Sequence, residues 1–253
     1  MKIDANVKQG LGYRSIQQDC VGLAGPSEKE DKGLLAVLSD GIGGMAGGEK
    51  YSQLAVDEML SSFKEEEALL EIEDMTEVLL TSYAKTRKAA LELSETGVDG
   101  GATLVAFLCW RDYGAFVSAG DSRIYLLRNK GLILLNRQQV VGPDLDEKAA
   151  FGLIYPEEAE YNLYRKALLN HVAEKADLPC DYGDHPFRLL SGDVIALLSD
   201  GVFQTLSEEE IAEVLSSSSE DKAKELIEAV ANRHMEKQDN YSAIVLTAYE
   251  DEG

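Results

Sequence analysis

The 253-residue sequence predicts an α+β fold in which paired helices lie outside antiparallel sheets. About eight strand-like runs are present, and most of them follow one another without a helix between them. Two helical patterns follow a glycine-rich stretch at residues 40–48, and two more lie near the carboxyl end. Helices grouped in pairs favour α+β layers, because an alternating parallel sheet would place a helix between successive strands.

The first half of the chain is predicted to contribute most of the strands and one helix pair. Alternating apolar residues predict a half-buried strand over residues 2–9, and the apolar run Leu34–Ser39 is typical of a buried strand. Apolar residues at helical spacing predict a helix that includes Tyr51–Phe63 and a second helix from Asp74 to Glu95. Four strands at hairpin spacing are expected next, at residues 104–110, 114–119, 124–128 and 132–135.

The second half begins with a weak signal and ends with clear patterns. We expect residues 136–186 to form a divergent, flap-like segment in which Pro156–Glu174 is helical. Clear patterns then predict a strand at Val194–Ser199 and a helix that begins with a capping box at Ser207. A second helix is predicted at residues 220–236 and a last strand at Tyr241–Tyr249. No Pro/Ser-rich linker divides the chain, so a single domain over residues 1–253 is predicted.

Composition argues against several classes of function. The net charge of −22, from 46 acidic and 24 basic residues, argues against nucleic acid as a partner. No run approaches the roughly eighteen apolar residues that cross a bilayer, and Met1–Asp4 lacks the apolar core of a secretion signal. A cytoplasmic protein without a membrane partner is therefore expected. Cys20, Cys109 and Cys180 are widely spaced, which predicts reduced thiols and no structural zinc site.

Two nearly identical stretches, Leu35–Gly41 and Ile195–Gly201, each consist of an apolar run that ends in Ser-Asp-Gly. Such runs are typical of buried strands, so Asp40 and Asp200 are expected at a sheet edge. Asp239 precedes the last apolar run, and an antiparallel pairing of that strand would bring it to the same edge. Carboxylates so close repel one another, and a hard cation such as Mg²⁺ or Mn²⁺ relieves that repulsion.

Each motif alone also has a structural interpretation. A strand that ends in Asp-Gly is common at turns. Arg14 and Asp19 could form a surface ion pair, and Gly120–Arg123 could be a tight turn with a local Asp–Arg pair. The glycines after Asp40 let backbone approach a ligand closely, although the Gly-Lys-Ser/Thr ending of a Walker loop is missing.

The motifs stand in a fixed order: Arg14-x4-Asp19, Asp40-Gly41-x-Gly43-Gly44, Gly101-Ala102-Thr103, Gly120-Asp121-Ser122-Arg123, Ser199-Asp200-Gly201 and Asp239-Asn240. This ordered set resembles the metal-dependent protein phosphatase family of type 2C in its compact bacterial form, over about residues 3–249. The resemblance implies a four-layer α-β-β-α sandwich, two antiparallel sheets flanked by helix pairs, with a binuclear Mg²⁺/Mn²⁺ centre at one end.

The resemblance also implies a set of metal ligands. Asp40 would bridge two ions, Asp200 and Asp239 would complete the first ion, and the carbonyl of Gly41 would complete the second. Asp121 matches the aspartate that, together with the equivalent of Asp200, holds a third and weaker ion in bacterial members. All of these ligands are oxygen atoms, the type that Mg²⁺ and Mn²⁺ prefer.

The same resemblance implies hydrolysis of phosphoserine and phosphothreonine in proteins by a water that bridges the metals. Arg14 would be the catalytic residue that binds the substrate phosphate, and Asp19 would act in catalysis by holding metal-bound waters. Gln18 and Asn240 would lie just outside the ligands. The expected substrates are phosphoproteins, those of a cognate Ser/Thr kinase, and the expected state is a monomer.

Four departures from the family pattern affect substrate recognition more than the metal ligands. Gln17 replaces the usual Asn of the first block, and Ile42 stands where the human-type family has a His. Gln138-Gln139 replaces an Asp-His pair, and the His-Pro and Arg-Asn pairs of the flap are missing around Asn162–Lys166. These losses leave open an alternative, a non-catalytic or highly specialised module that binds one regulatory phosphoprotein.

Overall fold

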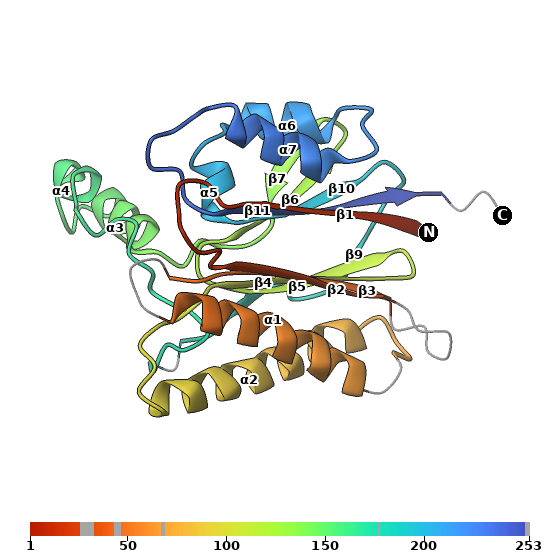
Figure 1. Cartoon of the computed structure of the whole chain (residues 1–253), viewed down its shortest axis with the longest axis horizontal. Helices are drawn as coiled ribbons and strands as arrows, with labels where there is room; N and C mark the ends of the chain where they lie inside the picture. Colours follow the sequence, from red (N-terminus) through yellow and green to blue (C-terminus); the bar gives the residue numbers. More distant parts are fainter. Residues whose placement is uncertain (26–32, 43–46, 67–68, 177, 251–253) are drawn as a thin grey trace.

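The computed structural model describes residues 1–25, 33–42, 47–66, 69–176 and 178–250. Two antiparallel sheets lie face to face, and a helix pair covers the outer face of each sheet (Figure 1). This arrangement is the predicted α+β sandwich, with the four layers in the order helices, sheet, sheet, helices. Residues 43–46, which carry part of the glycine-rich motif, lie outside the described residues.

The first sheet contains the first and the last strand side by side. Its strand order is β1 (Lys2–Gly10), β11 (Tyr241–Tyr249), β10 (Val194–Leu198), β6 (Arg123–Arg128) and β7 (Gly131–Leu134). The helices α6 (Glu208–Leu215) and α7 (Lys222–Ala231) cover its outer face. The predicted capping box is confirmed, because the Ser207 hydroxyl accepts from the Glu210 N–H while the Glu210 carboxylate accepts from the Ser207 N–H.

The second sheet packs against the longer helix pair. Its order is β2 (Asp19–Ala24), β3 (Leu34–Asp40), β4 (Leu104–Trp110), β5 (Tyr113–Ala119) and β8 (Asp181–Tyr182), and β9 (Phe187–Arg188) also pairs with β5. The helices α1 (Gly48–Glu65) and α2 (Asp74–Glu95) lie on its outer face. Every residue of β4 is buried, which explains its continuous apolar sequence.

Strand register brings the acidic residues to one end of the sandwich. In the second sheet β2 and β3 run antiparallel, so Asp19 lies opposite Asp40. In the first sheet β10 and β11 run antiparallel with Leu198 opposite Ala243, so the end of β10 lies beside the start of β11. The antiparallel arrangement predicted for the last strand is therefore confirmed.

The region after β7 differs from the sequence prediction. The predicted helix Pro156–Glu174 is wrong beyond its first turn, because α4 ends at Glu160. An unexpected helix, α3 (Val141–Ala150), precedes it and buries only Gly142, so it has no apolar stripe that could reveal it. Residues 165–172 instead form backbone hydrogen bonds with neighbouring segments, including Gly142 N–H to Arg165 O and Val172 N–H to Ala102 O.

Other elements were missed or shortened. The strands β2, β8 and β9 and the short helix α5 (Asp200–Phe203) were not predicted, and α7 ends at Ala231 and not near residue 236. The three cysteines are free, as predicted. Within the described residues, no helix combines the length and apolar character needed to cross a bilayer.

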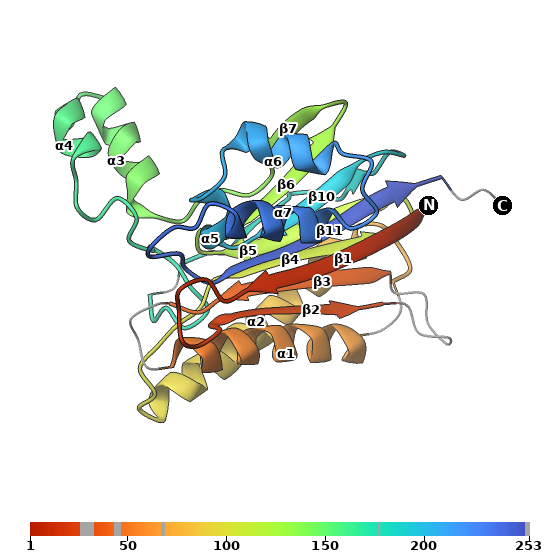
Figure 2. The same cartoon turned by 45° about the horizontal axis from the view of Figure 1, so that its top comes forward.

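The helices α3 and α4 stand apart from the four layers. Both views of the ribbon show them projecting from one end of the sandwich (Figures 1 and 2). We call residues 141–165 the α3–α4 lobe. The lobe lies at the same end as the loops that carry the acidic motifs, which makes it a neighbour of the candidate site.

Candidate metal and phosphate site

A cleft of about 370 Å³ lies at the end of the sandwich where the motif-bearing strands meet. Four carboxylates and one lysine lie in its wall, which is lined by Asp40, Ile42, Thr103, Asp121, Lys166, Ala167, Leu168, His171, Asp200 and Asp239. A larger cavity, about 540 Å³, lies beside the β6–β7 turn and the serine loop at residues 216–219. The smaller cleft is the functional candidate, because it gathers four carboxylates that come from distant parts of the sequence.

Asp40 is fixed at the end of β3 by Thr103. The Asp40 N–H donates to Thr103 Oγ1 at 3.0 Å, and the Thr103 N–H donates to the Asp40 carbonyl at 2.8 Å. The Ser39 hydroxyl donates to the Thr103 carbonyl at 2.6 Å, so the Gly-Ala-Thr motif positions the first aspartate. Gly41 must be glycine, because a Cβ there would lie 2.5 Å from the Gly48 carbonyl oxygen.

Asp19 lies opposite Asp40 and is almost fully buried. Its Oδ2 accepts hydrogen bonds from Ser199 Oγ at 2.7 Å and from Ser242 Oγ at 2.6 Å. Its Oδ1 is buried without a hydrogen-bond partner. A buried carboxylate oxygen left unpaired is costly, so this atom is available to accept a hydrogen bond from a water or ligand in the cleft.

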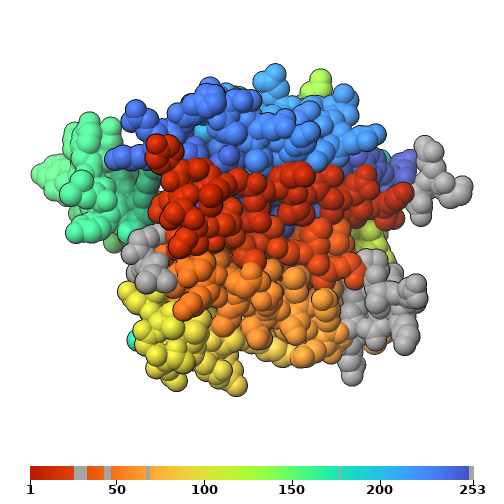
Figure 3. All heavy atoms as spheres, viewed as in Figure 1, coloured from red at the N-terminus to blue at the C-terminus, as the bar shows by residue number. Residues whose placement is uncertain are grey.

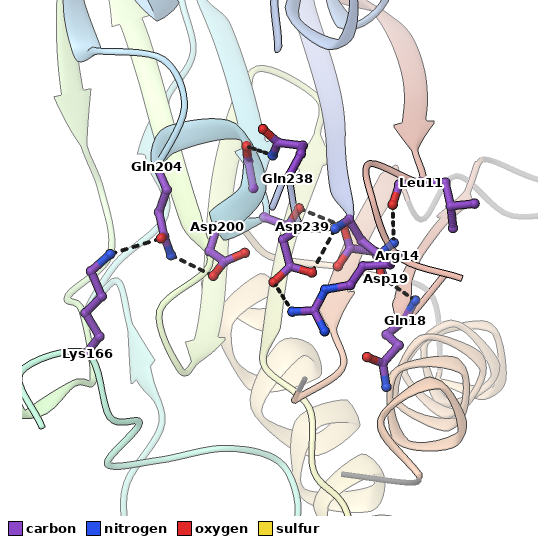
Figure 4. Close-up of polar contacts among 12 residues, drawn as sticks. Leu11, Arg14, Gln18, Asp19, Lys166, Asp200, Gln204, Gln238 and Asp239 are labelled. Atoms are coloured by element: carbon purple, nitrogen blue, oxygen red, sulfur yellow. Dashed lines mark hydrogen bonds and ion pairs between the residues drawn. The ribbon is translucent and has the colours of Figure 1, made fainter. Parts of the chain in front are cut away.

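Asp200 is the first residue of α5, two residues after the end of β10. Two side-chain hydrogen bonds connect it to Lys166, which follows the lobe. Gln204 lies one turn later and donates to Asp200 Oδ2 at 2.7 Å. Lys166 donates to Gln204 Oε1 at 3.0 Å (Figure 4). Among the described residues that line the cleft, Lys166 is the one Lys or Arg, so it brings a positive charge close to the carboxylates.

Arg14 pairs with Asp239 and not with Asp19. Its Nη2 lies 2.7 Å from Asp239 Oδ2, and the two side chains are 41% and 39% exposed (Figure 4). The structural alternative of an Arg14–Asp19 pair is therefore wrong. Asp239 lines the cleft, so its partner Arg14 lies next to the cleft wall.

Gln18 and Asn240 join the first loop to the start of the last strand. The Gln18 N–H donates to Asn240 Oδ1 at 2.9 Å, and Asn240 Nδ2 donates to the Leu11 carbonyl at 2.8 Å. Asn240 is buried, and its N–H donates to Asp239 Oδ1 at 2.8 Å. These contacts hold the loops of Asp19 and Asp239 together without contacting the cleft interior.

The electrostatics of the cleft favour a bound cation. Burial, followed by the charges of Asp19 and Asp200, raises the pKa of Asp40 well above its ordinary value. Burial, followed by the charges of Asp121 and Asp239, raises the pKa of Asp200 to about 7. Burial also raises the pKa of Asp19 and of Asp121. Divalent cations would relieve this repulsion, and an all-oxygen donor set suits Mg²⁺ or Mn²⁺.

The cleft offers carboxylate oxygens, the type of ligand that Mg²⁺ and Mn²⁺ prefer, but the side chains would have to change their positions to bind an ion. Among the described residues, no three Asp, Glu, His or Cys side chains form a ready ligand shell. Asp239 is engaged by Arg14, so it would exchange the guanidinium for the ion. Asp121 lies in the cleft wall with Asp200.

Several residues of the cleft were not singled out from the sequence. Ser199 and Ser242 hold Asp19, and their motifs, Ser-Asp-Gly and the start of the last strand, could have suggested that role. His171 packs against Gly101, where a Cβ would lie 2.7 Å from the imidazole Nδ1. Burial lowers the pKa of His171. Lys166 and His171 come from the weakly patterned segment, so no local signal could have placed them in the cleft.

Comparison with known proteins gives a consistent set of similarities. A family model described as "Protein phosphatase 2C" matches residues 14–239. The serine/threonine phosphatase stp of Listeria monocytogenes is 29% identical over 196 residues, which cover 76% of each chain.

Solved structures resemble the fold. The S. agalactiae serine/threonine phosphatase superposes with a TM-score of 0.84 at 24% identity, covering 98% of this chain and 100% of that one. The catalytic domain of a serine/threonine protein phosphatase PstP in complex with two manganese ions has a TM-score of 0.75 at 24% identity, covering 98% and 99%.

Proposed function

The chain belongs to the protein phosphatase 2C family, and from this premise we propose that it is a metal-dependent protein-serine/threonine phosphatase whose active site is the carboxylate cleft. The observation that carries the proposal is the convergence of Asp19, Asp40, Asp200 and Asp239 at one end of the sandwich. Residues 1–253 form one catalytic domain in this interpretation.

The metal ligands are proposed on the chemistry of the cleft. Asp40, the Gly41 carbonyl, Asp200 and Asp239 would hold two Mn²⁺ or Mg²⁺ ions, and Asp121 with Asp200 would hold a third, weaker one. Bound ions supply a water of lowered pKa and positive charge for the phosphoryl oxygens. The two manganese ions of the PstP catalytic domain support the number and type of ion.

The chain's own residues position the reaction. The Oδ1 of Asp19 can accept a hydrogen bond from a water in the cleft, while Ser199 and Ser242 hold its other oxygen in place. If Asp239 held an ion, the guanidinium of Arg14 would be free to donate two parallel hydrogen bonds to phosphoryl oxygens. Such charge-assisted bonds stabilise the charge that grows on the phosphoryl group during in-line attack.

Phosphate release from a phosphothreonine peptide tests the proposal directly. Purified protein with Mn²⁺ should release phosphate, EDTA should abolish the release, and a phosphotyrosine peptide of the same sequence should be cleaved poorly. Inertness toward several phosphopeptides and p-nitrophenyl phosphate, with Mn²⁺ shown to be bound, would favour the alternative of a non-catalytic binding module. The complete carboxylate set argues against that alternative.

The biological context remains a set of predictions. The substrates are proposed to be phosphoproteins made by a cognate Ser/Thr kinase, because a phosphatase of this class needs a kinase to supply its substrate. Monomeric state and cytoplasmic location are also predictions, and size-exclusion chromatography and cell fractionation check them.

A further inference from the structure

A second cavity, of about 540 Å³, lies at the end of the first sheet opposite to the carboxylate cleft. Its wall comes from the β6–β7 turn, the segment before β10, the loop between α6 and α7, and the end of β11. The strand β11 begins beside the cleft at Tyr241, and Thr247 lies in the cavity wall about 20 Å further along the strand. Figure 3 shows the two ends, with the lobe beside the cleft on the left and the end of β11 on the right.

The wall of this cavity contains a buried lysine, Lys222, which is the first residue of α7. Lys222 is 7% exposed, so nearly all of its side chain lies inside the protein. Its ammonium group donates to the Ser219 carbonyl at 2.7 Å. An ammonium has three N–H donors, and among the described residues the other two have no partner. We call this cavity the Lys222 cavity.

No carboxylate of the described residues forms an ion pair with Lys222. Asp193 lines the cavity, but Arg128 binds it, with Nε and Nη2 at 2.9 and 2.6 Å from the two carboxylate oxygens. Glu220 also lines the cavity and is exposed to solvent. Lysine is rarely buried without a charged partner, because the loss of water by an ammonium costs free energy. An anion in the cavity would supply the missing partner.

The serine loop forms one side of the cavity. The Ser217 hydroxyl holds the loop in shape, because it donates to Glu225 at 2.8 Å and accepts from the Ser219 N–H at 3.3 Å. Ser216 and Ser218 are exposed in the cavity wall, and no described residue bonds to their hydroxyl groups. The loop therefore offers two hydroxyl donors on an ordered backbone.

Part of the cavity wall is apolar. Leu127, Val194 and Leu215 line it and are each at most 5% exposed, and Tyr249 adds a partly exposed aromatic ring at the end of β11. The volume of the cavity lies in the range that holds small organic ligands. A phosphate or carboxylate group would meet Lys222 and the serine hydroxyls, while a small apolar body would contact the aliphatic side chains.

The charge of the chain makes this site unusual. A net charge of −22 repels anions from most of the protein surface. The Lys222 cavity is lined by three basic side chains and two acidic ones, namely Arg128, Lys130, Lys222, Asp193 and Glu220. Because Arg128 and Asp193 neutralise each other, two lysines remain against one exposed glutamate. The cavity therefore attracts anions locally.

We propose that the Lys222 cavity binds a small organic anion whose phosphate or carboxylate group pairs with the Lys222 ammonium. Ser216 and Ser218 donate hydrogen bonds to the same group, and the apolar part of the wall contacts the rest of the ligand. The site is independent of the phosphatase function, because no described residue lines both the cavity and the carboxylate cleft.

Binding to metal-free protein tests the site, because EDTA leaves the cleft with four carboxylates that repel anions. The probes are phenylphosphonate, benzoate and the neutral benzyl alcohol, which are similar in size. Calorimetry should give at least one of the two anions a Kd of about 1 mM, as expected for a ligand of about ten non-hydrogen atoms, and benzyl alcohol should not bind. At about ten times its Kd, that anion should raise the melting temperature by roughly 3–6 °C. Comparison of the two anions identifies the charged group that the cavity prefers.

Two variants of the cavity and a matched control locate the binding. Lys222→Met removes the buried charge, and Ser218→Asp places a carboxylate in the wall at an exposed position, so each should weaken anion binding at least about tenfold. Lys224→Met removes an exposed lysine of the same helix that pairs with Glu228 and does not line the cavity, so it should bind like the wild type. All three variants should hydrolyse p-nitrophenyl phosphate at the wild-type rate. Ser218→Asp keeps the test valid if circular dichroism shows that Lys222→Met does not fold.

The outcomes separate this site from the phosphatase function. Loss of binding in the cavity variants, with binding kept in Lys224→Met, supports the proposal. If neither anion binds the wild type, or if the anions bind the cavity variants as tightly as the wild type, the Lys222 cavity is not an anion site and the proposal is overturned. Neither result bears on phosphatase activity, because the binding assays contain no metal and follow no turnover.

Discussion

Replacing Asp239 by Asn tests whether the cleft carboxylates serve a metal or only the fold. The Asp239 side chain forms an ion pair with Arg14 at 2.7 Å and accepts from the Asn240 N–H at 2.8 Å. The paired side chains are 41% and 39% exposed, so screening limits the ion pair to about 0–1 kcal/mol. The same substitution also removes a negative charge that opposes ionisation of Asp200.

The repulsion can be sized from Asp200. Burial, followed by the charges of Asp121 and Asp239, raises its pKa from 3.8 to about 7, which disfavours the ionised form by roughly 4 kcal/mol. Burial is the largest cause, so the share of Asp239 is on the order of 1 kcal/mol. Relief of this repulsion offsets the lost ion pair. Metal-free Asp239→Asn should therefore melt within about 3 °C of the wild type, because 1 kcal/mol corresponds to about 2–4 °C at this size.

The result with metal should be different. Free Mn²⁺ at about 100 times its Kd stabilises the folded protein by about 2.7 kcal/mol, which raises the melting temperature by roughly 5–10 °C. Asp239→Asn should lose most of that gain and nearly all turnover. Scanning fluorimetry in EDTA and in Mn²⁺ measures both. Asp144→Asn is the matched control, because it removes the partner of Lys148 at the same 2.7 Å on the exposed lobe.

A structural aspartate predicts the opposite pattern. If Asp239→Asn lowered the melting temperature equally in EDTA and in Mn²⁺, while activity per folded molecule persisted, Asp239 would not be a metal ligand. The assignment of the cleft as a metal site would then be wrong.

Three further predictions concern groups that face the cleft. Arg14→Ala should lower kcat/KM by one to two decades, the scale of a lost charge-assisted hydrogen bond of about 1.5–3 kcal/mol, and unchanged kinetics would make Arg14 only a partner of Asp239. Lys166→Met should raise the KM for p-nitrophenyl phosphate a few-fold, because Lys166 brings positive charge to the cleft wall, and Lys166→Arg should keep the KM close to that of the wild type. Equal KM values for all three proteins would mean that Lys166 only forms its hydrogen bond with Gln204 and does not bind substrate. EDTA-treated protein should be more stable at pH 6 than at pH 8 by about 1 kcal/mol. Burial raises the pKa of Asp200 to about 7, so between its ordinary pKa and 7 the folded protein binds a proton that the unfolded chain has lost, and stability falls as the pH rises until the folded group also ionises. Urea unfolding that gives the same stability at both pH values would contradict the raised pKa.

Elements with a long periodic pattern could be predicted from the sequence. The helix α2 (Asp74–Glu95) and the strand β11 (Tyr241–Tyr249) have the predicted bounds, since each buries a regular set of apolar residues. The capping box at Ser207 was also correctly predicted, because it depends on residues three positions apart. The acidic edge followed from strand polarity alone, once Asp239 was placed before an apolar run that pairs antiparallel to β10.

The lobe and its surroundings could not be predicted in the same way. The helix α3 buries only Gly142, so periodicity carries no information about it. The path after α4 is set by long-range contacts, such as the isolated bridge between Val140 and Leu168 and the relay from Lys166 through Gln204 to Asp200. Contacts of this kind depend on the assembled sheets, and local sequence does not encode them.

The repeated Ser-Asp-Gly motif shows how one local sequence can serve two different local tasks. In the first copy, Ser39 donates to the Thr103 carbonyl and so ties the end of β3 to the segment that leads into β4. In the second copy, Ser199 donates across the sandwich to Asp19 and accepts from the Ser242 N–H, so it ties β10 to both the other sheet and β11. Replacing Ser39 would therefore loosen one sheet, whereas replacing Ser199 would remove one of the two hydroxyl groups that hold Asp19 and weaken the joint between the two sheets. Loss of Ser199 should therefore disturb the geometry of the cleft more than it lowers the stability of either sheet.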